Sequence, residues 1–165
     1  MAKAPPPAPP AGTLPGGLKP VASVIDLMHY FVDPLSAQLW GAVGGDTNPK
    51  TDEDWEALRA KAVMLMEASN LLVTEGRPVG HPGQKLINPS GDGDYTPDQA
   101  NEAVEKERAA FNAFALALQS ATGELLPTID KHDADAFLNA GGAIDEACEN
   151  CHLRFWYPNS AKPAG

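Results

Sequence analysis

Residues 133–158 read DADAFLNAGGAIDEACENCHLRFWYP, and this stretch decides the fold. Its inward-facing residues recur every three or four positions, which is typical of one face of an α-helix. They are Phe137, Gly141, Ile144, Cys148, Cys151 and Phe155. We expect the helix to begin near Asp130 or Asp133 and to end at Pro158, because proline cannot continue the helical hydrogen bonds. Other helices have to cover such a stripe.

Cys148, Cys151 and His152 form a C-x-x-C-H pattern within this helix, the pattern of covalent haem attachment. Two thiols three residues apart on a helix lie on nearly the same face, so each can add to a vinyl group of one haem. The histidine that follows is then placed to be the proximal ligand of the iron. The sequence therefore predicts one covalent haem c, bound by both cysteines and ligated by His152.

Other uses of the two cysteines fit the sequence less well. A C-x-x-C redox motif belongs in a βαβ setting, which this chain lacks. A structural zinc site needs four ligands, and only three cluster here. A disulfide between Cys148 and Cys151 is geometrically poor within a helix. Since these are the only cysteines in the chain, neither is left over for another role.

Three further helical stretches precede this one, over residues 21–43, 51–76 and 96–123. The first has an apolar stripe of Val24, Leu27, Met28, Phe31 and Leu35. The second has a seam of Trp55, Leu58, Ala62, Leu65, Ser69 and Leu72. The third has an inner face of Val104, Phe111, Phe114 and Leu118. No segment alternates in the manner of a strand, so we expect an all-α fold.

Two features interrupt the helical pattern. Pro34 removes one helical hydrogen bond and crowds the carbonyl of Tyr30, so we expect a kink there or a restart with Asp33 as N-cap. Residues 76–96 are rich in Gly, Pro, Asn and Asp. A connection of this length is unusual in a compact domain, and we interpret it as a crossover or as a flap over a site.

The termini differ in composition from the rest of the chain. Residues 1–20 are mostly Pro, Ala and Gly, which predicts a disordered Pro-rich arm. We expect one helical domain over residues 21–158 and a short tail over residues 159–165. The arm is either a passive tether or a segment that docks on a larger complex.

The order of four helices, with C-x-x-C-H on the last of them, resembles the cytochrome c′ family and its low-spin, methionine-ligated members. The resemblance covers about residues 21–157 and includes Phe155, three residues after His152. It implies an antiparallel four-helix bundle whose first helix carries the distal haem contact, where Met28 matches. One departure is Trp156, which stands where the family commonly has Arg or Lys.

The residue across the haem decides the function, and Met28 is the first candidate. A thioether ligand favours ferrous iron and raises the reduction potential. His29 is the alternative and points about 100° away round the helix; as a ligand it would give a bis-histidine haem. If neither residue binds, the iron is five-coordinate and open to small gases.

The charge of the chain narrows the class of partner. The 165 residues include 12 basic and 22 acidic side chains, a formal net charge of −10. Such a surface does not suit nucleic acid or an anionic membrane. It suits a redox protein with a basic docking patch. No run of apolar residues is long enough to span a membrane.

Together these patterns predict a one-electron carrier rather than an enzyme, because the chain has no phosphate loop, catalytic triad or paired-carboxylate site. The alternatives are a gas-binding haem protein and a haem subunit tethered to a larger electron-transfer complex. The oligomeric state stays open between monomer, homodimer and subunit of a complex. Covalent haem attachment normally takes place outside the cytoplasm, so we expect a periplasmic protein whose sequence here is a mature or trimmed form.

Overall fold

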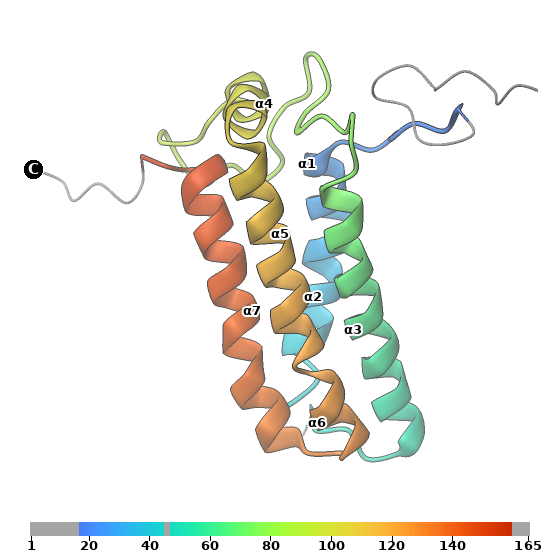
Figure 1. Ribbon diagram of the computed structural model, residues 1–165. Helices are drawn as coiled ribbons and strands as arrows, with labels where there is room; N and C mark the ends of the chain where they lie inside the picture. Colours follow the sequence, from blue (N-terminus) through green and yellow to red (C-terminus); the bar gives the residue numbers. More distant parts are fainter. Residues whose placement is uncertain (1–16, 45–46, 160–165) are drawn as a thin grey trace, which may run out of the picture.

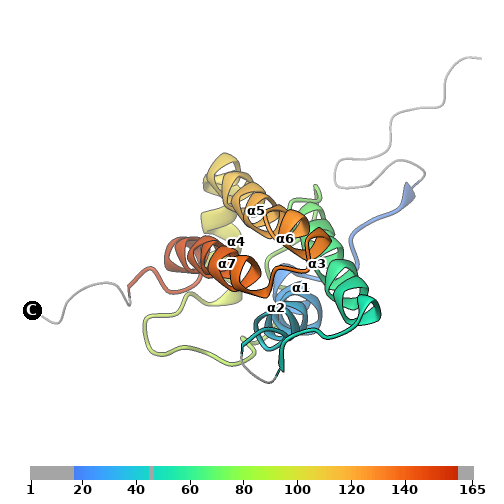
Figure 2. The ribbon, with the colours of Figure 1, turned by 90° about the horizontal axis from the view of Figure 1, so that it is seen from below.

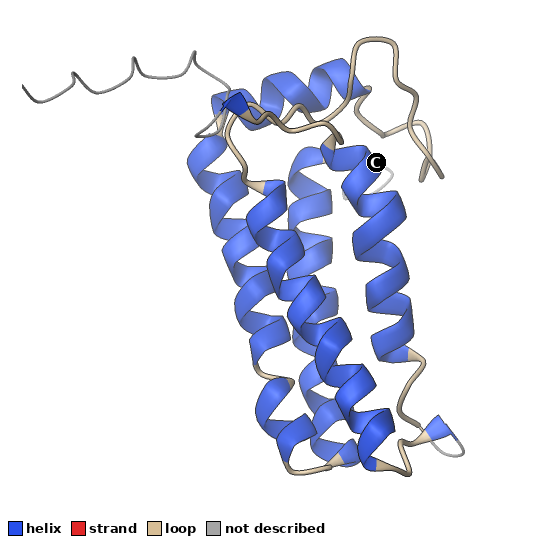
Figure 3. Cartoon of the chain, turned by 90° about the vertical axis from the view of Figure 1, so that its right-hand side faces the viewer, coloured by secondary structure: helices blue, strands red, loops and turns tan. Residues whose placement is uncertain are grey.

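The computed structural model describes residues 17–44 and 47–159, and every regular element in this part is a helix. The expected all-α class is therefore confirmed. Figure 3 shows these helices in blue, joined by loops, with no strand among the described residues. The Pro-rich arm expected over residues 1–20 falls mostly on residues 1–16, and the expected tail falls mostly on residues 160–165. Both of these ranges lie outside the described residues.

The first helical segment joins α1 (Val24–Leu27), a π-helical turn η2 (Met28–Val32) and α2 (Asp33–Trp40) in one run. Ser23 caps its start: the Ser23 hydroxyl accepts a hydrogen bond from the backbone N–H of Asp26, at 3.0 Å. The Asp26 carboxylate accepts one in return from the backbone N–H of Ser23, at 2.8 Å. This capping box satisfies two backbone donors near the start of the helix.

The turn η2 accommodates Pro34. Proline lacks a backbone N–H, and its ring crowds the carbonyl of Tyr30, so a regular α-helical turn is unfavourable there. The chain forms a wider turn instead, in which the backbone N–H of Asp33 donates to the carbonyl of Met28. Asp33 has helical angles, with φ −57° and ψ −48°. The expectation of a restart with Asp33 as N-cap is therefore wrong, because the helix runs on through this residue.

The extra residue in η2 changes which side chains face the core. A regular helix would continue the buried stripe through Phe31, but Phe31 is only half-buried. Val32 is buried in its place, with 3% of its surface exposed. Leu35 and Leu39 continue the buried stripe in α2.

The helix α3 (Asp52–Leu72) follows its sequence pattern closely. Thr51 caps it, and the Asp54 carboxylate completes the capping box by accepting a hydrogen bond from the backbone N–H of Thr51. The expected seam is confirmed, because each of its residues is buried: Trp55, Leu58, Ala62, Leu65, Ser69 and Leu72. The helix ends at Leu72, before the expected stop near Gly76.

The third expected stretch divides at Glu107 into α4 (Pro97–Lys106) and α5 (Arg108–Gly123). Thr96 and Gln99 form the expected capping box at its start. Glu107 itself has φ −123° and ψ 38°, which lies outside the helical region. As a result α4 turns away from the line of α5 (Figure 1).

A short helix, α6 (Leu126–Asp130), leads into α7 (Ala134–Phe155). The Asp133 carboxylate caps α7 by accepting a hydrogen bond from the backbone N–H of Ala136 at 2.9 Å. The expectation that this helix begins near Asp130 or Asp133 is confirmed. The buried residues of α7 are Phe137, Ile144, Ala147 and Phe155.

The long helices lie side by side, as Figures 1 and 2 show from two directions. The close backbone contacts of α7 are with α4, α5 and α6, whereas those of α2 are with η2 and α3. The facing sides of α2 and α7 therefore leave room for a cavity between them. None of the helices in the described ranges combines the length and apolar character that crossing a membrane requires.

Candidate functional site

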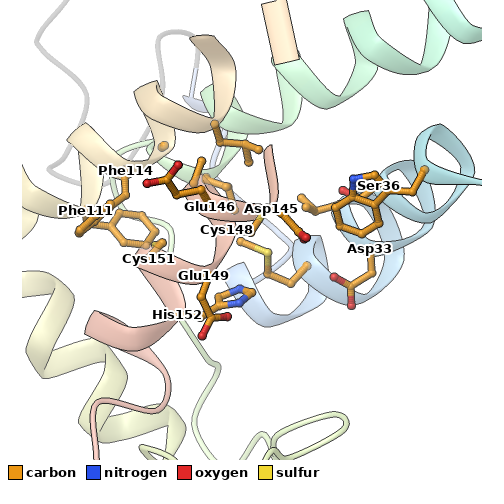
Figure 4. A pocket seen from close by; sticks show the side chains of 17 residues that line it. Asp33, Ser36, Phe111, Phe114, Asp145, Glu146, Cys148, Glu149, Cys151 and His152 are labelled. Carbon is orange, nitrogen blue, oxygen red and sulfur yellow. The ribbon is translucent and has the colours of Figure 1, made fainter. Parts of the chain in front are cut away.

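A cavity of about 450 Å³ opens between α7, α5 and the first helical segment (Figure 4). We call it the main cavity. The motif residues Cys148, Cys151 and His152 line it from α7, and Met28 lines it from η2. Phe111 and other apolar residues of α5 form a further wall. The structure thus brings all four predicted site residues to one space.

The two cysteines are free thiols, and both are half-buried. Burial raises the pKa of Cys148 to about 11, with smaller contributions from the carboxylates of Asp145, Asp33 and Glu149. Burial also raises the pKa of Cys151 to about 12, with a contribution from Cys148. Both thiols are therefore neutral near pH 7.

His152 is held neutral by its surroundings. Burial lowers its pKa below the ordinary value of 6.5, although the carboxylates of Glu149 and Asp33 act in the opposite direction. A neutral imidazole keeps a nitrogen lone pair free for a metal ion. Two thiols, a neutral imidazole and a thioether around one cavity are the groups that attach and ligate a haem.

Two aromatic rings, those of Trp156 and Tyr157, contact His152 at the end of α7. The Trp156 ring contacts His152 edge-on, with ring centroids 5.0 Å apart and an interplanar angle of 85°. The backbone N–H of Tyr95 donates to the Trp156 carbonyl at 2.7 Å. The Tyr157 hydroxyl donates to the Glu149 carboxylate at 2.6 Å.

A second cavity of about 100 Å³ adjoins the main one. The two cavities share the lining residues Met28, Asp33, Phe111, Cys151 and His152. The second cavity is otherwise largely apolar, and Leu86 and Ile87 of the loop between α3 and α4 close one side of it. His29 lines this second cavity and not the main one.

This connecting loop, residues 73–96, is held to α1 and α4 at residues 78–80, next to the second cavity. The backbone N–H of Val24 donates to Pro78, and that of Ile25 to Val79, at 2.9 and 3.0 Å. The Asn101 side chain of α4 accepts from the Val79 N–H at 2.6 Å and donates to the Gly80 carbonyl at 3.0 Å. Val79, Leu86 and Ile87 of this segment line the second cavity, and its interpretation as a crossover or as a flap over a site stays a prediction.

Asp26 ties the same loop to the start of α1. The Gln84 amide donates to the Asp26 carboxylate at 2.8 Å. The Nε2 atom of His81 lies 2.9 Å from the Val21 carbonyl and 3.8 Å from Asp26. From the sequence alone, His81 is expected to be a solvated loop residue. Its contacts could not be predicted, because they join residues about 60 positions apart in the chain.

Sequence reasoning missed several residues of the main cavity. Four carboxylates line it, and we call them the acidic rim: Asp33, Asp145, Glu146 and Glu149. Ser36 also lines the cavity, is only 3% exposed, and has no hydrogen-bond partner for its hydroxyl. Asp33 belongs to α2 and the other three carboxylates to α7, so only the arrangement of the helices in space reveals the rim.

Within the described ranges, His, Cys, Asp and Glu side chains nowhere form a group of three or more able to hold a metal ion directly. Comparisons of the chain with protein-family models, with curated proteins and with solved structures find no match. The functional assignment therefore rests on the residues of the site.

Proposed function

We propose that this chain is a mono-haem c-type cytochrome that carries single electrons between redox partners. The observation behind the proposal is that Met28, Cys148, Cys151 and His152 line one cavity of about 450 Å³. In this proposal Cys148 and Cys151 hold the haem through thioether bonds. His152 is the proximal iron ligand and Met28 the distal one.

The cavity itself supports a bound haem. Cofactor pockets typically measure about 300–1,000 Å³ and are mostly apolar. The main cavity lies within that range, and Val32, Leu72, Phe111 and Leu118 provide apolar walls. The lowered pKa of His152 supports the same assignment, because iron binds the neutral imidazole.

A bound haem supplies a reversible one-electron couple. The chain contributes the ligands and a largely apolar surround that limits contact with water. The Met28 thioether favours the ferrous state, and burial of the site tunes the potential further. No residue has to act as an acid, base or nucleophile, so the proposed role is that of a carrier and not of an enzyme.

We also propose that the helices form the antiparallel four-helix bundle of the cytochrome c′ family, with the domain at residues 21–158. Figure 1 supports this arrangement: the run from α1 to α2 descends, α3 ascends, α5 descends and α7 ascends. The motif lies near the end of the last helix. Because thioether attachment normally takes place outside the cytoplasm, the proposed location is the periplasm.

The acidic rim supports a basic redox partner. Its four carboxylates line the space in which the haem is proposed to lie, and the chain has a net charge of −10. A potential of this sign attracts a positively charged protein face and speeds the encounter.

Gas binding is the second candidate, and the second cavity favours it. Val24, Ile25 and Val79 give this space apolar walls directly beside Met28. A small diatomic molecule fits a space of about 100 Å³ if Met28 leaves the sixth position of the iron open.

Visible spectra of the ferric and ferrous holoprotein, before and after addition of carbon monoxide, distinguish the two candidates. The carrier proposal predicts a low-spin haem with methionine-ligation features, little response to carbon monoxide and one reversible one-electron transition. A high-spin haem that binds carbon monoxide readily contradicts the Met28 assignment and favours gas binding.

A further inference from the structure

The π-helical turn η2 begins at the proposed distal ligand. It spans Met28 to Val32 and is closed by the hydrogen bond from the Asp33 N–H to the Met28 carbonyl. A single π turn is equivalent to one extra residue inserted in an α-helix, and such turns are frequent at functional sites. Residues before and after the turn therefore differ in register by one position.

His29, the next residue in this turn, has an imidazole available for binding. It lines the second cavity together with Met28 and His152. Its ring meets the Tyr30 ring edge-on, with centroids 4.6 Å apart. Within residues 17–44 and 47–159, no hydrogen bond or ion pair engages its ring nitrogens.

The other histidines are not available to the two cavities. The chain has four in all. His81 is engaged with the Val21 carbonyl, and His132 stacks on Trp55 with ring centroids 5.1 Å apart. Neither lines the main or the second cavity. His29 is thus the one imidazole besides His152 at either space.

We propose that His29 is a reserve sixth ligand of the haem iron, which replaces Met28 when the π turn moves by about one turn toward the N-terminus. The inference rests on the proposed function. The extra residue of the π turn then lies before Met28 in the chain. Each residue between the old and the new place of the turn shifts by one position in the helix and occupies the place that the preceding residue held. His29 then occupies the former position of Met28.

Such a movement leaves both ends of the segment where they are. Val24 and Ile25 stay hydrogen-bonded to the connecting loop, and α2 stays packed on α3. Rotation of a whole helix would break these contacts. Displacement of the π turn changes only the orientation of the residues between its old and its new place. The exchange of ligand moves no electron by itself.

The two ligands favour different states of the iron. A thioether stabilises the ferrous state and raises the potential, whereas an imidazole gives a lower potential. Met28 is accordingly the preferred ligand of the reduced form, and His29 competes best in the ferric form. The test therefore uses the ferric protein.

The experiment compares ferric Met28→Ala with the double variant Met28→Ala/His29→Ala. Met28→Ala is expected to stay low-spin with a bis-imidazole spectrum and electron paramagnetic resonance signal, and the double variant is expected to be high-spin. Added imidazole should bind Met28→Ala at least about tenfold more weakly than the double variant, because His29 already occupies the site. The matched control, Met28→Ala/His132→Ala, should behave like Met28→Ala.

A high-spin Met28→Ala that binds imidazole as tightly as the double variant overturns the proposal. Circular dichroism and bound haem are measured for each variant, and Met28→Leu with His29→Gln replaces any alanine pair that does not fold. If the proposed function itself is wrong, the experiment gives a different result: the wild-type protein then carries no covalent haem.

Discussion

Ser36 and Ser23 are buried serines in the same helical run, but their hydroxyl groups have opposite roles. Ser36 lines the main cavity, and its hydroxyl is buried without a hydrogen-bond partner. The Ser23 hydroxyl caps α1. A buried hydroxyl without a partner carries the cost of its desolvation, whereas a capping hydroxyl satisfies a backbone donor.

Ser36→Ala is expected to raise the free energy of unfolding of the haem-free protein by about 1 kcal/mol, because it removes an unpaired buried hydroxyl from a helix. Ser23→Ala, the matched control, should lower it by about 1 kcal/mol. Urea unfolding followed by circular dichroism measures both. Equal losses of stability in the two variants would contradict the assignment of Ser36.

Asp54 links the stability of α3 to pH. Its carboxylate accepts hydrogen bonds from the backbone N–H groups of Lys50 and Thr51, and these lower its pKa below the ordinary value of 3.8. A group whose pKa is lower in the folded state stabilises that state above its unfolded pKa, and this stabilisation is lost as the pH falls through the folded pKa.

Asp54→Asn should therefore lower the urea midpoint near pH 7 and have little effect near pH 2. Glu53→Gln is the control, since it removes a neighbouring charge of the same first turn that no described hydrogen bond uses. A loss of stability in Asp54→Asn that is the same at both pH values would show that the charge is not responsible.

At the scale of the element, the connecting loop depends on Gly80. A Cβ atom at this position would lie 2.5 Å from the Cβ of Pro97. Gly80→Ala is therefore expected to lower the free energy of unfolding by about 1–3 kcal/mol, the usual cost of overpacking. Gly91→Ala in the same loop has open space around it and should change little. Urea unfolding of the two variants is the measurement, and equal stability would contradict this account of the loop.

The elements differ in how far the sequence predicts them. The α3 seam was predictable because Trp55 to Leu72 form an uninterrupted helix with a constant period. The first segment was not, because η2 inserts one residue and moves the buried position from Phe31 to Val32. Pro34 signals that an interruption is near but does not specify its form.

The residues of the candidate site likewise differ in how far the sequence predicts their placement. Cys148, Cys151 and His152 lie close together in the chain, so their spacing alone predicts a shared face. The main cavity and the acidic rim lie between α2 and α7, which face each other across the cavity, and Ser36 lines it without a partner for its hydroxyl. Contacts between distant helices leave no local pattern in the sequence, and so they could not be predicted from it.

At the scale of the whole molecule, the acidic rim should govern the rate of reaction with a basic redox protein. Glu146→Lys is expected to lower the second-order rate constant at low ionic strength by about tenfold, because attraction between opposite charges steers the encounter. Added salt should reduce the difference.

Glu102→Lys is the control, since it makes the same change in net charge at an exposed position that lines neither cavity. Stopped-flow mixing with a basic redox protein measures both rates. Equal slowing by the two variants would assign the effect to net charge and not to the acidic rim.

The central claim is that the chain carries one covalent haem at Cys148 and Cys151. The most direct test is the mass of the denatured protein after expression in a host that matures c-type haem, followed by peptide mapping. We predict the polypeptide mass plus one haem, with the addition on the peptide that contains residues 148–152, and no addition in Cys148→Ala/Cys151→Ala. A folded wild-type protein with the mass of the polypeptide alone would contradict the claim.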